Sequence, residues 1–467
     1  MEFLGIQTDI KNVPQYDTGF IPMAKFNKTF LAQAKKPITI AVERNAGLCA
    51  VYDTFITGVN TDADRYYVER MVKYLLWAKG GYKVTVCGDD AIGAYIKEAF
   101  STTGKYAFDN GMMARVYEKP FEVVVLPLDQ KPAENEQAKA VGGKTGGCRI
   151  GFDAGGSDRK VSAVIDGEAV YSEETVWYPK VTPDPDYHFN GIVEAMKTAA
   201  SKLPRVDSIG VSSAGIYIDN RTMAASLFLK VSPEDFEAKV KDIYIRAAAE
   251  IGPDIPLSVV NDGDVTALAG AMEFGDNNVL GIAMGTSEAG GYIDENGRIK
   301  GWLNELAFCP VDASPTAMID EWAGDIGCGV KYFSQDGVIK LALAAGINLD
   351  TTRPPGENLK VVQDIFLGKG EEAQALYKGT ELLEAVACGI FQSIGAYLGH
   401  TLPYYWDLYG FKHVLLLGRV MSGEGGNIIL DTARKVIAEE YADYVFNIHT
   451  PDEKARRVGQ SVAAASL

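Results

Sequence analysis

Histidine and cysteine, the residues that most often build metal centres and disulfide frameworks, are scarce in this sequence. There are four histidines and six cysteines in 467 residues. No two cysteines form a C-x-x-C pair, so their spacing predicts neither a disulfide framework nor a zinc knuckle. Reduced thiols, mostly buried in the core, are the expectation instead.

Long apolar runs and an excess of positive charge are also lacking. No apolar run has the length needed to cross a bilayer, and the N-terminus has neither the basic region nor the apolar core of a signal peptide. The net charge of −17 argues against non-specific binding to nucleic acid or to an anionic membrane. We therefore expect a cytoplasmic protein with no nucleic-acid partner and no membrane partner.

The chain has more residues than a single hydrophobic core usually supports, so two or three domains are expected. Residues 1–130 predict a small α/β domain, in which an irregular arm of about 36 residues precedes alternating strands and helices. Residues 131–147 are rich in Lys, Ala, Glu and Gly and predict a linker. They contain Gly142-Gly-Lys-Thr145, but Ala138 stands where a P-loop needs its first glycine, and no apolar strand precedes it.

The stretch 148–166 is the most informative part of the chain. It predicts an apolar strand that ends at Asp153, a turn containing Gly155, Gly156 and Ser157, and a second strand. Glycines let backbone N–H groups approach a ligand closely, and successive N–H groups form a concavity suited to phosphate oxygens. Asp153 beside this turn could hold Mg²⁺, because hard cations prefer oxygen ligands. Together these features indicate a hairpin that handles ATP.

A second candidate site lies at 259–269, where a strand runs into a helix. Asn261 and Asp262 come at the carboxyl end of that strand, the edge at which open α/β sheets bind ligands. A carboxylate there can accept the proton of an attacking hydroxyl group. Plain helix capping by Asn and Asp explains the same residues equally well.

Two further glycine-containing loops could contact a nucleotide. Gly285 and Thr286 lie in the turn of a second predicted hairpin at 279–293, and an ordinary hairpin turn is the alternative. Gly418 and Arg419 follow an apolar strand and could hold the adenosine or α-phosphate end of a nucleotide. A simple strand–helix connection is the alternative there.

The order of these segments is similar to that of an actin-like, two-lobed ATPase. More narrowly, it resembles the ROK family of sugar kinases (repressor, open reading frame, kinase), over roughly residues 148–467. The matching segments are Asp153-Ala-Gly-Gly-Ser157 for the motif D-x-G-G-T, Asn261-Asp262 with Ala267-Leu-Ala269 for N-D-A-N-x-A-A-L-A, Met284-Gly-Thr286 with Gly290-Gly291 for the second phosphate motif, and Asn304-Glu-Leu-Ala-Phe308 for G-E-I-G-H.

The resemblance implies an α/β fold with two ribonuclease-H-like lobes and an interlobe cleft, in addition to the N-terminal domain. Lobe I would comprise residues 148–262 with 450–467, and lobe II residues 263–449. Asp262 would be the general base, and Asn261, Asn304 and Glu305 would lie at the sugar. ATP and Mg²⁺ are the implied cofactors and a sugar the implied substrate, with a homodimer as one option.

Several residues depart from the family pattern. The zinc motif C-x-C-G-x-x-G-C is absent apart from Gly327-Cys328, so no zinc site is expected. Phe308 replaces the family's histidine, Glu288 lies in the second phosphate loop, and Arg419 occupies a position that is usually glycine. These changes motivate an alternative, a catalytically impaired protein that senses a sugar or a nucleotide. An actin-like ATPase without a small acceptor is a third option.

Overall fold

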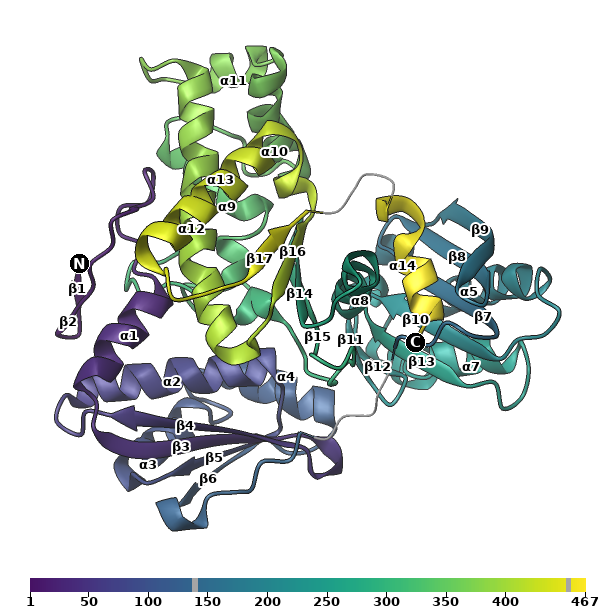
Figure 1. The fold of residues 1–467 in the computed structure, drawn as a ribbon, viewed down its shortest axis with the longest axis horizontal. Helices are drawn as coiled ribbons and strands as arrows, with labels where there is room; N and C mark the ends of the chain where they lie inside the picture. Colours follow the sequence, from purple (N-terminus) through teal and green to yellow (C-terminus); the bar gives the residue numbers. More distant parts are fainter. Residues whose placement is uncertain (137–141, 451–454) are drawn as a thin grey trace.

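The computed structural model describes residues 1–136, 142–450 and 455–467 (Figure 1). Residues 137–141 of the predicted linker, including Ala138, and residues 451–454 of predicted lobe I lie outside the described residues. Within the described part, three sheets of four or five strands form three bodies, which we call the N-terminal layer, the first lobe and the second lobe. No helix among the described residues is long and apolar enough to cross a membrane.

The N-terminal layer is a mixed sheet with the strand order β4-β3-β5-β6. Strand β3 pairs antiparallel with β4 and β5, and β6 pairs parallel with β5. The strands are β3 (Lys36–Glu43), β4 (Cys49–Ile56), β5 (Lys83–Cys87) and β6 (Glu122–Leu126), and the helices are α1 (Met23–Gln33), α2 (Thr61–Ala78), α3 (Asp90–Ala99) and α4 (Ala107–Tyr117).

Two helices of this layer correct the sequence-based expectations. The prediction of an irregular N-terminal arm was wrong, because this segment contains α1, which buries Met23, Phe26 and Phe30 at helical spacing. Helix α4 was not predicted, since Asp109, Asn110 and Gly111 interrupt its apolar pattern. The predicted linker begins as part of this layer, because Asn135 pairs with Cys49 of β4.

The first lobe contains a five-stranded sheet in the order β13-β10-β7-β8-β9. Strands β7, β8 and β9 form an antiparallel meander, and β10 lies parallel to both β7 and β13. The elements are β7 (Cys148–Ala154), β8 (Asp158–Ile165), β9 (Glu168–Val176), α5 (Pro185–Ala200), β10 (Ser208–Ser213), β11 (Ile216–Ile218), β12 (Arg221–Ala224), α6 (Pro233–Asp235), α7 (Ile243–Ala249), β13 (Leu257–Asn261) and the C-terminal α14 (Ala455–Ala465).

The second lobe repeats the hairpin-and-parallel-strand arrangement, in the order β15-β14-β16-β17. Helix α8 packs on β14 and β15, while the long helix α12 packs against α13 and reaches the N-terminal layer (Figure 1). The elements are α8 (Asp262–Phe274), β14 (Val279–Met284), β15 (Glu288–Ile293), α9 (Gln335–Ala344), α10 (Pro355–Gln363), α11 (Glu371–Leu376), α12 (Leu383–Tyr409), β16 (His413–Leu417), α13 (Gly423–Glu440) and β17 (Asn447–His449).

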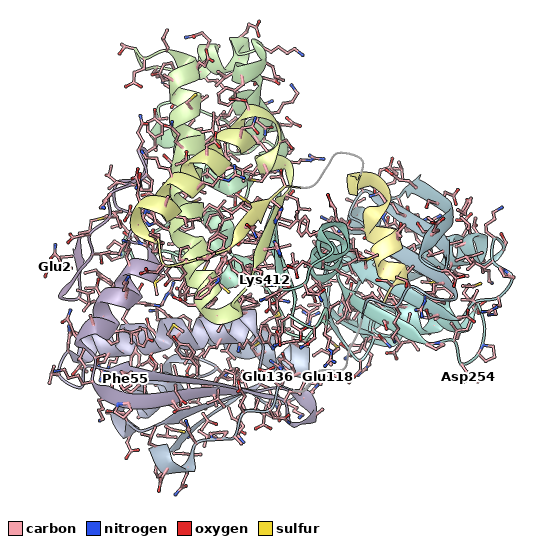
Figure 2. The ribbon with its side chains drawn as sticks, in the orientation of Figure 1. Glu2, Phe55, Glu118, Glu136, Asp254 and Lys412 are labelled. Atoms are coloured by element: carbon pink, nitrogen blue, oxygen red, sulfur yellow. The ribbon has the colours of Figure 1, made fainter. Side chains whose placement is uncertain are left out.

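The N-terminal layer contacts the two lobes in different ways. One apolar cluster runs without a break from its sheet into the second lobe and also includes Ile216 and Met223 of the first lobe, whose other buried apolar residues mostly form a separate core. Against the first lobe, Glu118 at the end of α4 pairs with Arg221 at 2.7 Å and with Lys241 at 2.6 Å. Figure 2 labels Glu118 at this junction, beside the first lobe.

The start of α8 packs unusually closely on β15. A Cβ atom on Gly263 would lie 2.1 Å from the Gly290 carbonyl oxygen, and one on Gly291 would lie 2.0 Å from Gly263. Only glycine fits such a backbone contact. The contact therefore determines where α8 begins, and with it the position of the preceding Asp262.

We expect Gly263→Ala to destabilise the protein by at least about 1–3 kcal/mol, because the added methyl group has no space. Urea unfolding of the purified chain measures this. Gly111→Ala is the matched control, since a Cβ there meets no atom within 4 Å, and it should be neutral or stabilising by roughly 0.4–1 kcal/mol. Equal effects of the two substitutions would contradict the packing argument.

Candidate active site

Asp153 lies at the carboxyl-terminal end of β7, where the sheet register sets it level with Ser212 of β10. The Ser212 hydroxyl donates a 2.7 Å hydrogen bond to Asp153 Oδ1. The carboxyl group is 3% exposed. Burial raises the pKa of Asp153 to about 6, although the bond from Ser212 and the charge of Lys160 oppose the rise.

The two glycines of the turn after β7 lie close to neighbouring atoms. A Cβ on Gly155 would lie 2.7 Å from the Asp158 carbonyl oxygen, and one on Gly156 would lie 3.0 Å from Lys180 Nζ. Ser157 donates a 3.0 Å hydrogen bond to the Asp158 side chain. Lys180 therefore places its ammonium group against the predicted phosphate turn, which sequence reasoning missed because the residue follows β9.

Lys180 is exposed and sits in a short 3₁₀ turn, Pro179–Val181. That turn is held by His188, whose Nε2 lies 3.0 Å from the Pro179 carbonyl oxygen and whose Nδ1 lies 2.9 Å from that of Asp184. A second cation, Lys160, lies beside the turn, paired with Asp158 at 2.9 Å. The first hairpin therefore has positive charge next to its glycines.

Asn261 and Asp262 follow β13, which lies beside β10 in the same sheet. The Asn261 side chain caps α8 by accepting from the Gly263 N–H at 2.7 Å, and its amide donates to the Gly215 carbonyl oxygen at 2.8 Å. An amide group has further bonding capacity, so the capping role and a ligand contact are compatible.

Asp262 lies at the centre of an electrostatic cluster. Burial raises its pKa, while the Gly263 N–H and Lys180 oppose the rise. The charge of Asp262 in turn contributes to the raised pKa values of Asp153 and of Glu305. The structure thus brings together Asp153, Asp262, Lys180 and Glu305, which are widely separated in the sequence.

Glu305 and Asn304 lie on a loop that is held by the N-terminal layer. The Asn304 and Glu305 N–H groups donate to the carbonyl oxygens of Ala78 and Trp77, at 2.9 and 3.0 Å, at the end of α2. Glu305 is half-buried. Burial, reinforced by the charge of Asp262, raises the pKa of Glu305 to about 7.

Asn304 is 3% exposed, and both ends of its side chain bond within the protein. Its amide nitrogen donates to Asp264 at 2.8 Å, and its oxygen accepts from Tyr409 at 3.1 Å. Asp264 also accepts from the Tyr292 N–H at 3.0 Å. The Asn304 side chain therefore holds its loop in place through bonds to Asp264 and Tyr409. The neighbouring Glu305 is less buried.

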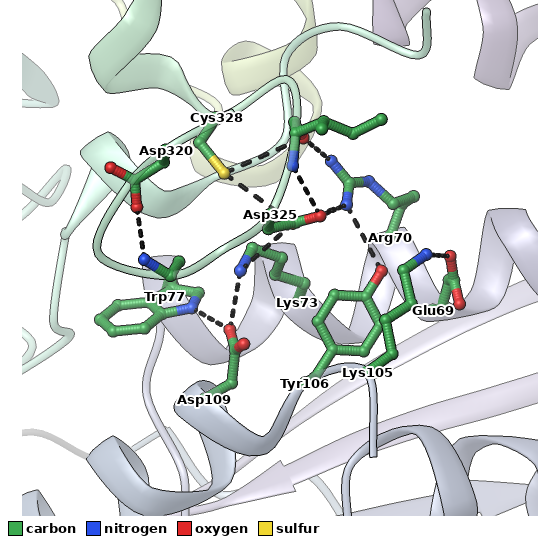
Figure 3. A network of polar contacts seen from close by, with 12 residues as sticks. Glu69, Arg70, Lys73, Trp77, Lys105, Tyr106, Asp109, Asp320, Asp325 and Cys328 are labelled. Carbon is green, nitrogen blue, oxygen red and sulfur yellow. Dashed lines mark hydrogen bonds and ion pairs between the residues drawn. The ribbon is translucent and has the colours of Figure 1, made fainter. Parts of the chain in front are cut away.

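Phe308 stacks on Trp77 of α2, with ring centroids 4.2 Å apart. Trp77 also belongs to a buried ionic network between α2, α4 and the loop before Cys328, which Figure 3 shows. Arg70 and Lys73 of α2 pair with Asp325 at 2.7 and 3.3 Å, and Lys73 also pairs with Asp109 at 2.9 Å. Burial alone would raise the pKa of Asp325, but these two cations hold it at about 2.

The second predicted phosphate loop is the turn between β14 and β15. The Gly285 carbonyl oxygen accepts from the Gln335 N–H at 2.9 Å, and Thr286 lies at the tip of the turn. Gly418, with φ of 107°, ends the adjacent strand β16. A Cβ on Gly418 would lie 2.3 Å from the Met284 carbonyl oxygen, so the two segments adjoin. Arg419 is exposed, with a guanidinium nitrogen near Gly356 at the start of α10.

Glu288 does not point toward the second loop. Its side chain is 2% exposed, and Oε1 accepts from the Tyr405 hydroxyl of α12 at 3.2 Å. Burial raises the pKa of Glu288 to about 8. This residue therefore brings no exposed negative charge to the place where phosphates would bind.

Three comparisons relate the chain to known proteins. No protein-family model and no curated protein matches it. Among solved structures, a ROK hexokinase from Thermus thermophilus is 16% identical with a TM-score of 0.50, and the match covers 68% of this chain and 98% of that one. A ROK glucokinase from Streptomyces griseus, in complex with glucose and AMPPNP, is 20% identical with a TM-score of 0.47 and the same coverage of both chains.

A ROK transcriptional regulator, a homologue of the E. coli MLC protein, is 16% identical with a TM-score of 0.46, and the match covers 68% of this chain and 78% of that one. The hexokinase match shows that the chain has the fold of the ROK-family sugar kinases. The predicted α/β fold of the actin-like type is therefore confirmed.

We expect the buried carboxyl of Glu288 to make stability depend on pH. Its pKa of about 8 lies above the ordinary value of 4.5, so folding favours the protonated form, and stability falls as pH rises from about 4.5 to about 8 and no longer changes through this group above that. Glu288→Gln removes this penalty and should stabilise the protein at pH 8 by up to a few kcal/mol, with little change at pH 5. Urea unfolding at both pH values measures the difference.

The exposed Glu168 of β9 supplies the control for that measurement. Glu168→Gln should change stability to the same small extent at the two pH values. A Glu288→Gln variant that behaves in the same way would show that Glu288 is charged in the folded protein at neutral pH.

Proposed function

We propose that the chain is an ATP-dependent carbohydrate kinase in which Asp262 is the general base. The observation that carries this proposal is the convergence of Asp262 with Asp153, Glu305 and Lys180 at the carboxyl ends of β7, β10 and β13. The hexokinase whose fold this chain shares supports the same reaction class. The protein would act in the cytoplasm on a small sugar rather than on a nucleic acid.

In the proposed reaction, an acceptor hydroxyl attacks the γ-phosphorus of ATP. A new O–P bond forms, the bond from the γ-phosphorus to the β,γ-bridging oxygen breaks, and ADP leaves with the electron pair. Asp262 takes the hydroxyl proton, which requires the ionised carboxylate that Lys180 favours. Asn261 and Glu305 would bond the other hydroxyls and so orient the acceptor.

The two glycine turns would hold the phosphates. On the first-lobe side, the phosphate oxygens would accept hydrogen bonds from the backbone N–H groups of Gly155 and Gly156, the Ser157 hydroxyl and the Lys180 ammonium group. On the second-lobe side, the rest of the nucleotide would be held by Gly285, Thr286, Gly418 and Arg419. Such a site works mainly by positioning and by neutralising charge.

Asp153 fits a role as a Mg²⁺ ligand. Its carboxylate accepts from Ser212 through Oδ1, the residue lies at the end of β7 just before the first turn, and oxygen is the donor that Mg²⁺ prefers. When bound, the ion would neutralise charge on the phosphates. No group of three metal-binding side chains occurs among the described residues, so phosphate and water oxygens would complete the coordination.

We expect Asp262→Asn to lower acceptor-dependent ADP release by roughly 10²–10⁴-fold, because the amide cannot take the proton. The assay supplies ATP, Mg²⁺ and one sugar at a time from a panel of hexoses and amino sugars. Asp276→Asn, on the exposed surface, is the matched control and should keep full activity.

The same assay separates the alternatives. Sugar or nucleotide binding without turnover in the unmodified protein would identify a sensor. ADP release that is independent of any acceptor would identify an ATPase. Full sugar phosphorylation by Asp262→Asn would contradict the assignment of the base while leaving the reaction class intact.

We expect Lys180→Ala to reduce turnover by about 10-fold or more, through weaker stabilisation of the phosphoryl group and of ionised Asp262. Its effect on kcat should exceed its effect on the KM for the sugar. Lys202→Ala, another lysine of the first lobe, is the control and should change neither constant. Unchanged turnover in Lys180→Ala would show that this ammonium group plays no part in the reaction.

A further inference from the structure

Two histidines of the second lobe lie with their ring nitrogens side by side. His413 begins β16 and His449 ends β17, and these strands pair in parallel (Figure 1). His413 Nδ1 and His449 Nε2 are 3.0 Å apart. Both residues are half-buried, so the pair lies near the surface of the lobe. Neither residue has a part in the proposed kinase reaction.

The end of helix α8 determines which nitrogen of the neutral His413 ring carries the proton. His413 Nε2 lies 3.1 Å from Asp276 Oδ2, and this bond is the largest cause that lowers the pKa of Asp276 to about 2. An ionised carboxylate only accepts, so Nε2 carries the hydrogen and Nδ1 keeps its lone pair. Histidines that bind metals usually donate their other ring N–H to a carboxylate in this way.

The separation of the two nitrogens suits a shared metal ion. Zn²⁺ binds histidine nitrogen at about 2.0–2.1 Å, so two such ligands lie about 2.9 Å apart at a right angle and about 3.4 Å apart at a tetrahedral angle. The observed 3.0 Å lies between these values. To bind the ion, the neutral His449 ring has only to carry its proton on Nδ1 instead of Nε2.

Two further side chains adjoin the pair. Phe274 of α8 stacks on the His449 ring with centroids 4.0 Å apart. Asn447 Nδ2 lies 3.5 Å from His413 Nδ1, and turning the amide over would present its oxygen instead. No group of three His, Cys, Asp or Glu side chains that could hold a metal occurs in the part of the chain that the structure describes. The ion would therefore have two histidine ligands, and amide and water oxygens would complete its coordination.

The charges around the pair act in both directions. Asp276 is negative, and it follows the end of α8, where a helix carries about half a negative charge. Against this, Lys412 lies 3.3 Å from Asp276, and the charge of Arg434 adds to burial and His413 in lowering the pKa of His449. Electrostatic attraction alone would not select this place for a cation, so binding depends on the two nitrogen ligands.

We propose that His413 and His449 bind a divalent transition-metal ion of the zinc, nickel or copper type. Imidazole suits these ions, whereas Mg²⁺ and Ca²⁺ prefer oxygen ligands. The ion would link β17 to β16, to which it is paired over only three residues, and so would stabilise this edge of the sheet. Gly418 lies five residues further along the chain, about 17 Å at the rise of a strand, so the site is separate from the proposed nucleotide contacts.

Calorimetric titration of the full-length protein with Zn²⁺, and separately with Ni²⁺, tests the proposal. We expect one ion per chain, with affinity at least 10-fold lower in His413→Gln and in His449→Gln. Asp276→Ala should lower the affinity by about 10-fold, because the carboxylate behind a ligating histidine typically contributes that much. Arg434→Gln should raise the affinity, because a repelling charge is removed.

Two controls accompany the titration. Asn427→Ala, an exposed residue of α13, should leave the affinity unchanged, and Mg²⁺ should not bind at the histidines. Zn²⁺ should also raise the melting temperature of the unmodified protein but not that of His449→Gln, because an ion that binds only the folded state stabilises it.

Affinity that is unchanged in both histidine variants would overturn the proposal, as would equal binding of Mg²⁺ at the pair. Crystals soaked in Zn²⁺ should show the ion at about 2.0–2.1 Å from both nitrogens. An ion on one histidine alone, or only the direct hydrogen bond between the rings, would overturn the proposal as well. His449→Gln keeps the test valid if His413→Gln fails to fold. None of these outcomes depends on kinase turnover, so the proposed function is tested independently.

Discussion

The buried ionic network between α2 and the loop before Cys328 is the interaction on which the rest of the architecture depends. Lys73 is fully buried and shares its charge between Asp109 and Asp325, while Arg70 pairs with Asp325 from the next turn of the helix. Removing one partner of such a pair leaves an uncompensated buried charge and costs about 3–5 kcal/mol. Helix α2 is therefore fixed against the second lobe, and its last carbonyl groups hold Asn304 and Glu305. The N-terminal layer therefore holds in place the loop that carries Glu305, which we propose to contact the acceptor.

Different charged neighbours explain why the pKa values of Asp325 and Glu305 differ. Asp325 faces two cations, and its pKa is about 2. Glu305 is half-buried, its acidic neighbours are Asp262 and Asp264, and burial together with their charges raises its pKa to about 7. Carboxyl groups whose pKa values are separated in this way can divide proton donation and acceptance between them. Burial raises the pKa of Asp262, the carboxyl group that we propose as the base, and the charge of Lys180 opposes that rise.

The parts of the fold that sequence predicted are those whose causes are local. A glycine turn between two apolar strands was enough to predict the hairpins at Asp153 and Gly285. Likewise, the change from an apolar strand to a helix was enough to predict the helix cap at Asn261. Lys180 could not be predicted, since it reaches Gly156 only because the meander brings the end of β9 back beside the first turn. The ion pair of Lys73 with Asp325 joins residues more than 250 positions apart, so no periodicity or motif in the sequence predicts it. Gly290 and Gly291 resembled a phosphate motif, yet their clearest role is the close backbone contact with Gly263.

The contrast between the two interfaces of the N-terminal layer bears on how the lobes could move. Toward the second lobe there is a continuous apolar core with buried charges, which cannot separate without exposing both. Toward the first lobe, the ion pairs of Glu118 with Arg221 and Lys241 are partly exposed, and pairs of that kind contribute about 0–1 kcal/mol and are screened by salt. A rotation of the first lobe would break these ion pairs and would also separate Ile216 and Met223 of β11 and β12 from the apolar cluster of the layer.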